Sequence, residues 1–122
     1  MIDQEIWKDI CLKGKEYNYQ ISNYGRVKNK KTGRILKLQK RGQHKGNYSC
    51  VDLCKYGIRQ RIDIQRLVAI HFISNVDHKS EVNHLDGDHY NNRVDNLEWC
   101  TRSENERHKR FLEGCREVEN EG

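Results

Sequence analysis

Apolar and polar residues alternate in short segments through the first half of the chain, and three glycine turns separate these segments. The turns are Ser22-Asn23-Tyr24-Gly25, Lys31-Thr32-Gly33 and Lys55-Tyr56-Gly57. A period of two is typical of β-strands with one buried face. In segment 58–62 it places two arginines, Arg59 and Arg61, on the face opposite the isoleucines. The pattern predicts a small antiparallel β module with one packed face and one face open to a polyanion.

The hydrophobic period changes after Asp63. Ile64, Leu67, Val68 and Phe72 recur at the spacing of one helix face. Asp63 is a residue type favoured at a helix N-cap. This pattern predicts a short buried helix.

A dense polar cluster spans residues 81–101. Asp86-Gly87 is expected to end a first strand, residues 88–95 to form a compact Asn/Asp-rich loop, and residues 97–100 to form a second strand. The segment after this cluster has the composition of a helix. Ser103 and Glu106 have the spacing of a capping box, and Gly114 predicts the helix end. The cluster and the helix together predict a β-β-α unit.

These elements indicate an α+β protein in which a small N-terminal antiparallel β module with a short helix precedes the β-β-α unit. We divide the chain into residues 1–62, residues 63–114 and an acidic tail, 115–122. Only 34% of the 122 residues are hydrophobic and 34% are charged, so the core must be small. We assign Trp7, Trp99 and Phe111 to it. No apolar stretch approaches the roughly 20 residues of a membrane-spanning helix, and we expect no membrane partner.

Charge is distributed unevenly between the two halves of the chain. Residues 1–60 hold 14 Lys/Arg and 5 Asp/Glu, whereas residues 61–122 hold 9 and 13. Between Arg26 and Arg61 only Asp52 opposes twelve basic residues. Such a surface favours nucleic acid as the partner, although a lysine-rich face can also be merely solvated or guard a sheet edge. The candidate DNA contacts are Arg26, Lys28, Lys30, Arg34, Lys37, Arg59 and Arg61.

The five cysteines are odd in number, scattered, and without a secretion signal. This usage favours a reducing cytoplasm over a disulfide framework. Cys50 and Cys54 lie in an expected strand, where roughly 13 Å separates them, so they are poorly placed to share a zinc ion.

Three polar residues stand at a diagnostic spacing: His84, Asn96 twelve residues later, and Asn105 nine further on. Around them are Asn83-His84-Leu85-Asp86-Gly87, Asn91-Asn92 and Asp95-Asn96-Leu97-Glu98-Trp99. This pattern resembles the HNH nucleases of the ββα-metal fold, in the branch of phage and intron homing endonucleases. Upstream, residues 6–10 and 19–27 resemble the nuclease-associated modular motif that precedes the HNH domain in that branch. The resemblance implies a metal-dependent DNA endonuclease.

His84 is the candidate general base, because phosphodiester hydrolysis needs an activated water and an imidazole can accept its proton at neutral pH. The resemblance implies metal ligands at Asn83 and Asn105, where the family often has an acidic residue or histidine at the first position. Adjacent strand residues point oppositely, so Asn83 and His84 share a site only if the strand ends or twists there. Two amide oxygens suit magnesium or manganese better than zinc.

Asn96 resembles the middle residue of the family name, which bonds to backbone across the loop and supports the base. Lys109 stands where some members have a third histidine ligand. Lys109 and His108 are candidates for contact with the scissile phosphate, or are ordinary helix surface.

The sequence therefore predicts a DNA endonuclease that nicks one strand of duplex DNA. We expect a monomer in the cytoplasm, of a bacterial host if the chain is phage-encoded. The rival interpretation is a catalytically weak or inactive DNA-binding module on an HNH scaffold, for which Asn83 is the best argument. RNA binding ranks behind both, because the basic strands lack an aromatic pair for stacking bases.

Overall fold

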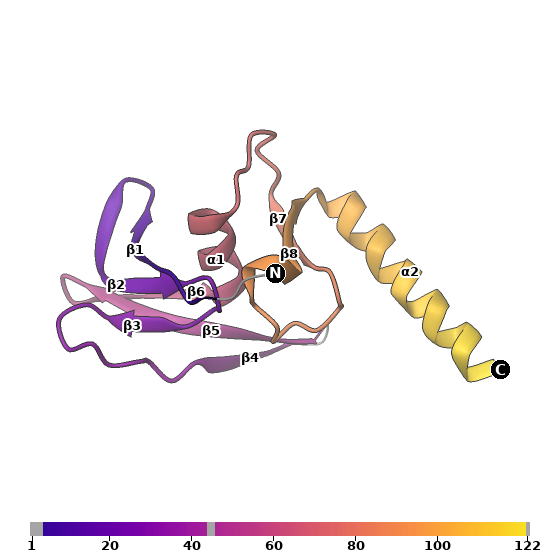
Figure 1. Ribbon diagram of the computed structural model, residues 1–122, viewed down its shortest axis with the longest axis horizontal. Coiled ribbons are helices and arrows are strands. Elements are labelled where there is room, and N and C mark those ends of the chain that lie inside the picture. The colour runs from indigo at the N-terminus through magenta and orange to yellow at the C-terminus, as the bar shows by residue number, and fades with distance from the viewer. Residues whose placement is uncertain (1–3, 44–45, 122) are drawn as a thin grey trace.

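Two three-stranded antiparallel sheets form the first half of the chain in the computed structural model, which describes residues 4–43 and 46–121 (Figure 1). The first sheet consists, in order, of β1 (Trp7–Leu12), β2 (Lys15–Ser22) and β3 (Val27–Asn29). The second consists of β4 (Gln39–Gln43), β5 (Gly46–Lys55) and β6 (Ile58–Asp63). Gly25 and Gly57 turn between strands with φ of 86° and 75°, a region that glycine adopts without a steric penalty. The predicted antiparallel β module is confirmed.

Helix α1 (Ile64–Phe72) lies at the centre of the molecule, between these sheets and the C-terminal strands (Figure 1). Ile64, Leu67 and Val68 are fully buried, and they pack with Ile10 and Leu53 of the two sheets. Asp63 precedes the helix in extended conformation, but its side chain makes no capping hydrogen bond. The shared core joins the two halves of the chain around α1.

The C-terminal half forms the predicted β-β-α unit. Strand β7 (Glu81–His84) pairs antiparallel with β8 (Leu97–Cys100), and a short 3-10 helix, η1 (Val94–Asn96), leads into β8. Helix α2 (Arg102–Glu121) follows directly. The register places Asn83 opposite Glu98 and His84 opposite Leu97.

Both ends of α2 differ from the prediction. The capping box consists of Thr101 and Glu104, not Ser103 and Glu106: the Glu104 N–H donates to the Thr101 hydroxyl (3.2 Å), and the Thr101 N–H to the Glu104 carboxylate (2.9 Å). Since β8 ends at Cys100, the first residue free to cap is Thr101. The helix also continues through Gly114, because an interior glycine costs only about 1 kcal/mol relative to alanine. Residues 115–121, assigned above to an acidic tail, belong to this helix.

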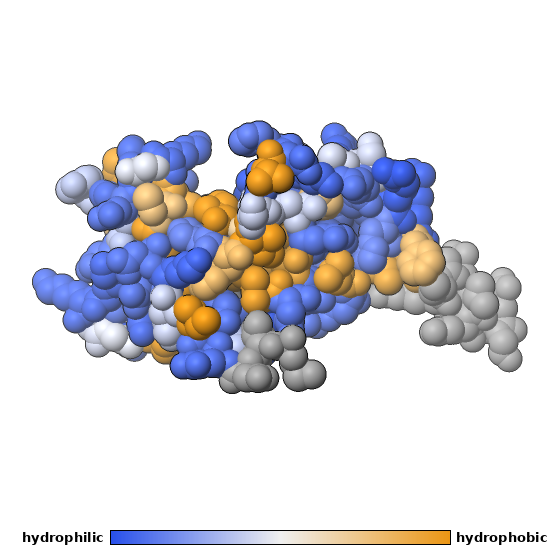
Figure 2. All heavy atoms as spheres, turned by 45° about the horizontal axis from the view of Figure 1, so that its top comes forward, coloured by the Kyte–Doolittle hydropathy of each residue, from blue (hydrophilic) through white to orange (hydrophobic). Residues whose placement is uncertain are grey.

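Some of the predicted core residues lie at or outside its margin. Phe111 is 66% exposed, because α2 projects away from the body of the molecule and has nothing there to cover (Figure 1). Trp7 and Trp99 are half-buried. Ile62 packs against the core, whereas Ile58, near the hairpin tip, is 72% exposed. The face in Figure 2 is mostly hydrophilic, with exposed apolar side chains gathered near its middle. Within the described residues, no helix is long and apolar enough to cross a membrane.

Thr101 and Ser103 both carry a hydroxyl near the start of α2, but only Thr101 forms the capping pair, so replacing them should have different effects on stability. Replacing Thr101 with alanine removes an acceptor at the start of α2 and should lower the free energy of unfolding by about 1 kcal/mol. The control Ser103→Ala should change it by less than about half of that. Urea unfolding followed by circular dichroism measures both. Equal losses in the two variants would contradict the assigned cap.

Candidate active site

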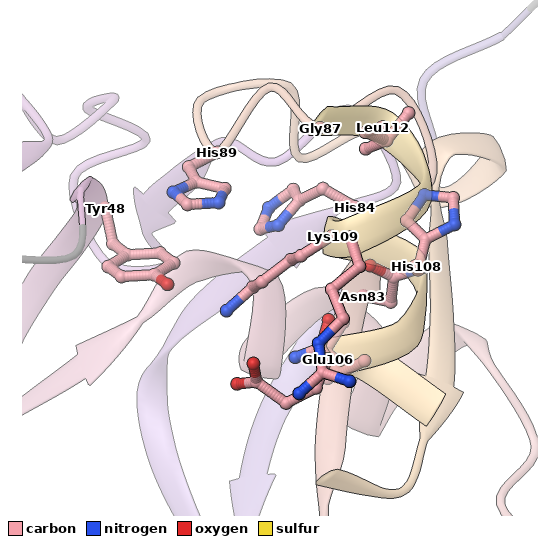
Figure 3. A pocket seen from close by; sticks show the side chains of 12 residues that line it. Tyr48, Asn83, His84, Gly87, His89, Glu106, His108, Lys109 and Leu112 are labelled. Atoms are coloured by element: carbon pink, nitrogen blue, oxygen red, sulfur yellow. The ribbon is translucent and has the colours of Figure 1, made fainter. Parts of the chain in front are cut away.

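A pocket of about 560 Å³ lies between the end of β7, the loop that follows it and the first turns of α2 (Figure 3). Asn83 and His84 both line it, although they are adjacent in one strand. They share the pocket because β7 ends at His84 and the chain turns at Gly87, where φ is 78°. The strand thus ends at the point where the sequence analysis required it to end if Asn83 and His84 were to share a site.

The imidazole of His84 is buried, with 4% of the residue exposed. Its Nε2 lies 2.8 Å from the side-chain oxygen of Asn92. An amide oxygen only accepts, so this hydrogen bond places the ring proton on Nε2 and leaves Nδ1 unprotonated. Burial lowers the pKa of His84, and the bond to Asn92 with the charges of Asp86 and Asp88 offsets only part of that effect. The neutral, proton-accepting form is thus favoured.

Asn92 was absent from the residues predicted for the site. The sequence offered a signal, since Asn91-Asn92 belongs to the motif that carries the family resemblance, but spacing alone assigned it no contact. The structure shows that Asn92 is 4% exposed and orients His84.

Two further amides, those of Asn83 and Asn105, line the same pocket and are 4% and 9% exposed. Each is held by a carboxylate: the Asn83 amide donates to Glu98 at 3.0 Å, and the Asn105 amide donates to Glu81 at 2.9 Å. Within the described part of the chain, neither amide oxygen accepts a hydrogen bond. Sequence reasoning missed Glu81 and Glu98, whose roles depend on cross-strand and strand-to-helix pairing.

This donor set fits a hard cation. Amide oxygens with free lone pairs are ligands that magnesium and manganese accept, and the carboxylates behind them add negative charge. Among the described residues, no three His, Cys, Asp or Glu side chains gather into a group that could hold a metal. Asn83 and Asn105, which both line the pocket, are residues that could hold such a cation.

Asn96 closes the loop between the two strands. Its side-chain oxygen accepts from the Asp86 backbone N–H (3.1 Å), and its amide donates to the Asp86 carboxylate and the Asn91 carbonyl, both at 2.9 Å. The backbone N–H of Leu85 also donates to the Asn96 carbonyl (2.8 Å). These bonds fix the chain directly after His84.

The remaining predicted residues of the helix lie beside this pocket. Lys109 lines it and is half-buried, and His108 lines it while its Nε2 lies 3.0 Å from the Leu85 carbonyl. On the opposite wall, the ring of Tyr48 stacks on His89 with centroids 4.6 Å apart, and His89 lies 5.3 Å from His84. Tyr48 comes from β5, a contribution from the first half of the chain that local sequence patterns do not show.

The candidate DNA contacts lie elsewhere, and the described lining of the pocket includes none of them. Three of the seven are paired with carboxylates: Arg26 with Glu5, Lys30 with Asp9, and Arg61 with Asp52. Lys28 lies over the Trp7 ring, 4.3 Å from its centroid. The other three, Arg34, Lys37 and Arg59, are exposed.

Comparison with known proteins finds a match for each half of the chain. Residues 5–54 match the NUMOD4 motif, and residues 64–107 match the HNH endonuclease model. Over 99 residues the chain is 42% identical to DNA endonuclease I-HmuI of Bacillus phage SP01, covering 81% of this chain and 54% of that protein. Over 106 residues it is 45% identical to the uncharacterized HNH endonuclease L247 of Acanthamoeba polyphaga mimivirus, covering 85% of this chain and 26% of the relative.

A solved structure described as DNA binding and cleavage by the HNH homing endonuclease I-HmuI superposes with a TM-score of 0.74 and 38% identity. The match covers 88% of this chain and 59% of that one. The chain therefore belongs to the HNH endonuclease family and carries a NUMOD4 motif ahead of its HNH segment. It spans about half or less of the length of these curated relatives.

The burial of His84 has a measurable consequence. In the metal-free protein, the pKa of its ring should lie below the ordinary value of about 6.5, because the charged form loses hydration in the pocket. Asn92→Ala should lower the pKa further, since that hydrogen bond raises it. NMR titration of the ring resonances, assigned by their loss in His84→Ala, measures both. A titration midpoint above 6.5 would contradict the assigned environment.

Proposed function

We propose that this chain is a divalent-metal-dependent endonuclease that hydrolyses phosphodiester bonds of double-stranded DNA. One observation carries the proposal: a buried histidine with a fixed proton-accepting nitrogen lines the same pocket as two amide oxygens suited to a hard cation. Membership of the HNH family supports the reaction, and the I-HmuI relative, described as a homing endonuclease, supports DNA as the substrate.

The residues of the pocket divide the work of hydrolysis. His84 accepts the proton of the attacking water at Nδ1, while Asn92 holds the ring through Nε2. Asn96 supports the backbone that carries His84. A divalent ion held by Asn83 and Asn105 would supply positive charge to the phosphate as negative charge develops on its oxygens. In this proposal Lys109, and His108 beside it, contact the scissile phosphate, which their position on the pocket wall supports.

A single pocket of this kind cuts one phosphodiester bond at a time, so a nick is the expected product of a monomer. The basic residues of the first half hold the duplex in this proposal, with Arg34, Lys37 and Arg59 as the exposed contacts. Arg26, Lys28, Lys30 and Arg61 remain candidate contacts in this proposal, and three of them are paired with carboxylates in the DNA-free chain. We propose the cytoplasm as the place of this activity, because the five cysteines of the sequence are odd in number and scattered along the chain.

Asn83 also favours a second candidate function. Because this amide stands where an acidic ligand is frequent in the family, the chain could bind DNA through the same fold and cleave it weakly or not at all. The two functions differ in what happens when His84 is removed.

A plasmid-nicking assay separates them. With magnesium or manganese, the parent chain should convert supercoiled plasmid to the open circle, and His84→Ala should slow this by at least about 100-fold, the contribution of a general base. The control His78→Asn changes an exposed histidine in a loop and should cleave as the parent does. Absence of cleavage by the parent, with DNA binding equal in parent and variant, would instead establish the binding module.

Because the proposed ligands Asn83 and Asn105 are uncharged, the affinity for the ion should depend on whether DNA is bound. Manganese should bind the DNA-free protein weakly and at least about tenfold more tightly with duplex present, since phosphate oxygens then complete its coordination. Titration calorimetry on the His84→Ala protein measures this without cleavage. Asn83→Asp should tighten binding in the absence of DNA, and Asn83→Leu should remove the gain seen with duplex. Equal affinities with and without duplex would overturn this prediction.

A further inference from the structure

The turn between β2 and β3, residues Ser22 to Gly25, lies in the N-terminal module but is internally fixed and buried. Ser22 accepts backbone N–H groups of Tyr24 and Arg26 on its hydroxyl, both at 3.1 Å. Asn23 accepts the Ile6 N–H at 2.8 Å and donates to the Gln4 carbonyl at 3.1 Å. Ser22 is fully buried and Asn23 is 4% exposed. The side chains of Ser22 and Asn23 thus fix the backbone of the turn and attach it to the segment before β1.

The outer side of this turn contacts the loop of the HNH segment at three consecutive residues. The backbone N–H of Val94 donates to the Asn23 carbonyl at 2.9 Å. The guanidinium of Arg93 lies over the Tyr24 ring, 4.2 Å from its centroid. Gly25 meets Asn92, where a Cβ on the glycine would lie 3.0 Å from both the Cβ and the carbonyl oxygen of Asn92. That is closer than the roughly 3.5–4.0 Å of an ordinary contact, so a side chain at Gly25 would displace Asn92.

Asn92 links this turn to the pocket. Its backbone rests on Gly25, and its side chain holds Nε2 of His84 at 2.8 Å. Asn92 and His84 are each 4% exposed, so neither can relax into solvent without leaving its packed position. A shift of the loop at Asn92 must therefore move the ring or break the hydrogen bond that fixes its tautomer.

We propose that the Ser22–Gly25 turn of the N-terminal module is a positioning element for His84 and acts through Asn92. The N-terminal module then contributes to catalysis itself, in addition to any contact with DNA. This inference rests on the proposed role of His84 as general base. Gly25 and Asn92 are positioning residues, because neither needs to touch the substrate.

Gly25→Ala and Gly33→Ala form a matched pair. Both glycines have positive φ, 86° and 73°, so alanine strains the backbone at either position, but a Cβ at Gly33 meets nothing within 4 Å. Gly25→Ala should slow single-turnover nicking by at least about tenfold, as expected for a misplaced catalytic group, and leave the Kd for duplex within about twofold. Gly33→Ala should leave both the nicking rate and the Kd for duplex within about twofold of the parent values. Equal slowing by both variants, or a loss of nicking explained by weaker DNA binding, would overturn the proposal.

A double-mutant cycle tests the path through Asn92. If Gly25 acts through Asn92, adding Gly25→Ala to Asn92→Ala should slow nicking by less than about twofold beyond Asn92→Ala alone. Multiplicative effects would overturn the proposal. Should Gly25→Ala fail to fold, Tyr24→Ala takes its place in the same cycle, since it removes the ring beneath Arg93.

The tautomer of His84 gives a readout that does not depend on cleavage. Nitrogen NMR shifts should show Nε2 protonated in the parent and in Gly33→Ala, and a mixture of tautomers in Gly25→Ala and Asn92→Ala. An unchanged tautomer in Gly25→Ala would overturn the positioning role. If His84→Ala still cleaves at the parent rate, the proposed function fails, whereas the spectra still report whether the turn sets the ring.

Discussion

The bonds that Asn96 makes across the loop are the constraint on which the pocket depends. The residues between β7 and β8 have no ladder of their own, and these bonds hold the start of the loop, at Asp86, against its end, at Asn96. Each bond contributes only about 1 kcal/mol. Their combined effect is geometric, since Asp86 and Asn91 are held at once by a single side chain. The chain that follows His84 is fixed by that closure, and the ring itself is held by Asn92.

Four asparagines line this pocket or support the residues that line it, and the chemistry of the amide explains why. An amide carries a donor and an acceptor on one planar group, so binding one end directs the other. Asn83 and Asn105 are bound through their nitrogens and present oxygens, whereas Asn92 presents its oxygen to an imidazole. Asn96 uses both ends. Four side chains of one type thus perform three different tasks, according to the partner that holds each.

The sequence predicted the elements well where a local pattern determines them, as in the glycine turns, α1 and the β-β-α unit. It also predicted that Asn83 and His84 could share a site. It misplaced the cap of α2 by two residues, because two overlapping capping patterns compete and only the end of β8 selects between them. Tyr48, Glu81 and Glu98 were missed because their positions depend on pairing between distant segments. Phe111 was assigned to the core, but α2 projects away from the body of the molecule and leaves this side chain exposed.

The amides of the proposed ion site have partners in the protein itself, and this affects how the chain folds. A cluster of buried carboxylates would repel one another until a counter-ion arrived, which would link folding to the supply of that ion. Here the buried groups, Asn83 and Asn105, are uncharged, and the carboxylates of Glu81 and Glu98 are already hydrogen-bonded to them. The β-β-α unit that holds the proposed ion site can therefore fold without a bound ion, so the proposed site is formed before any ion binds.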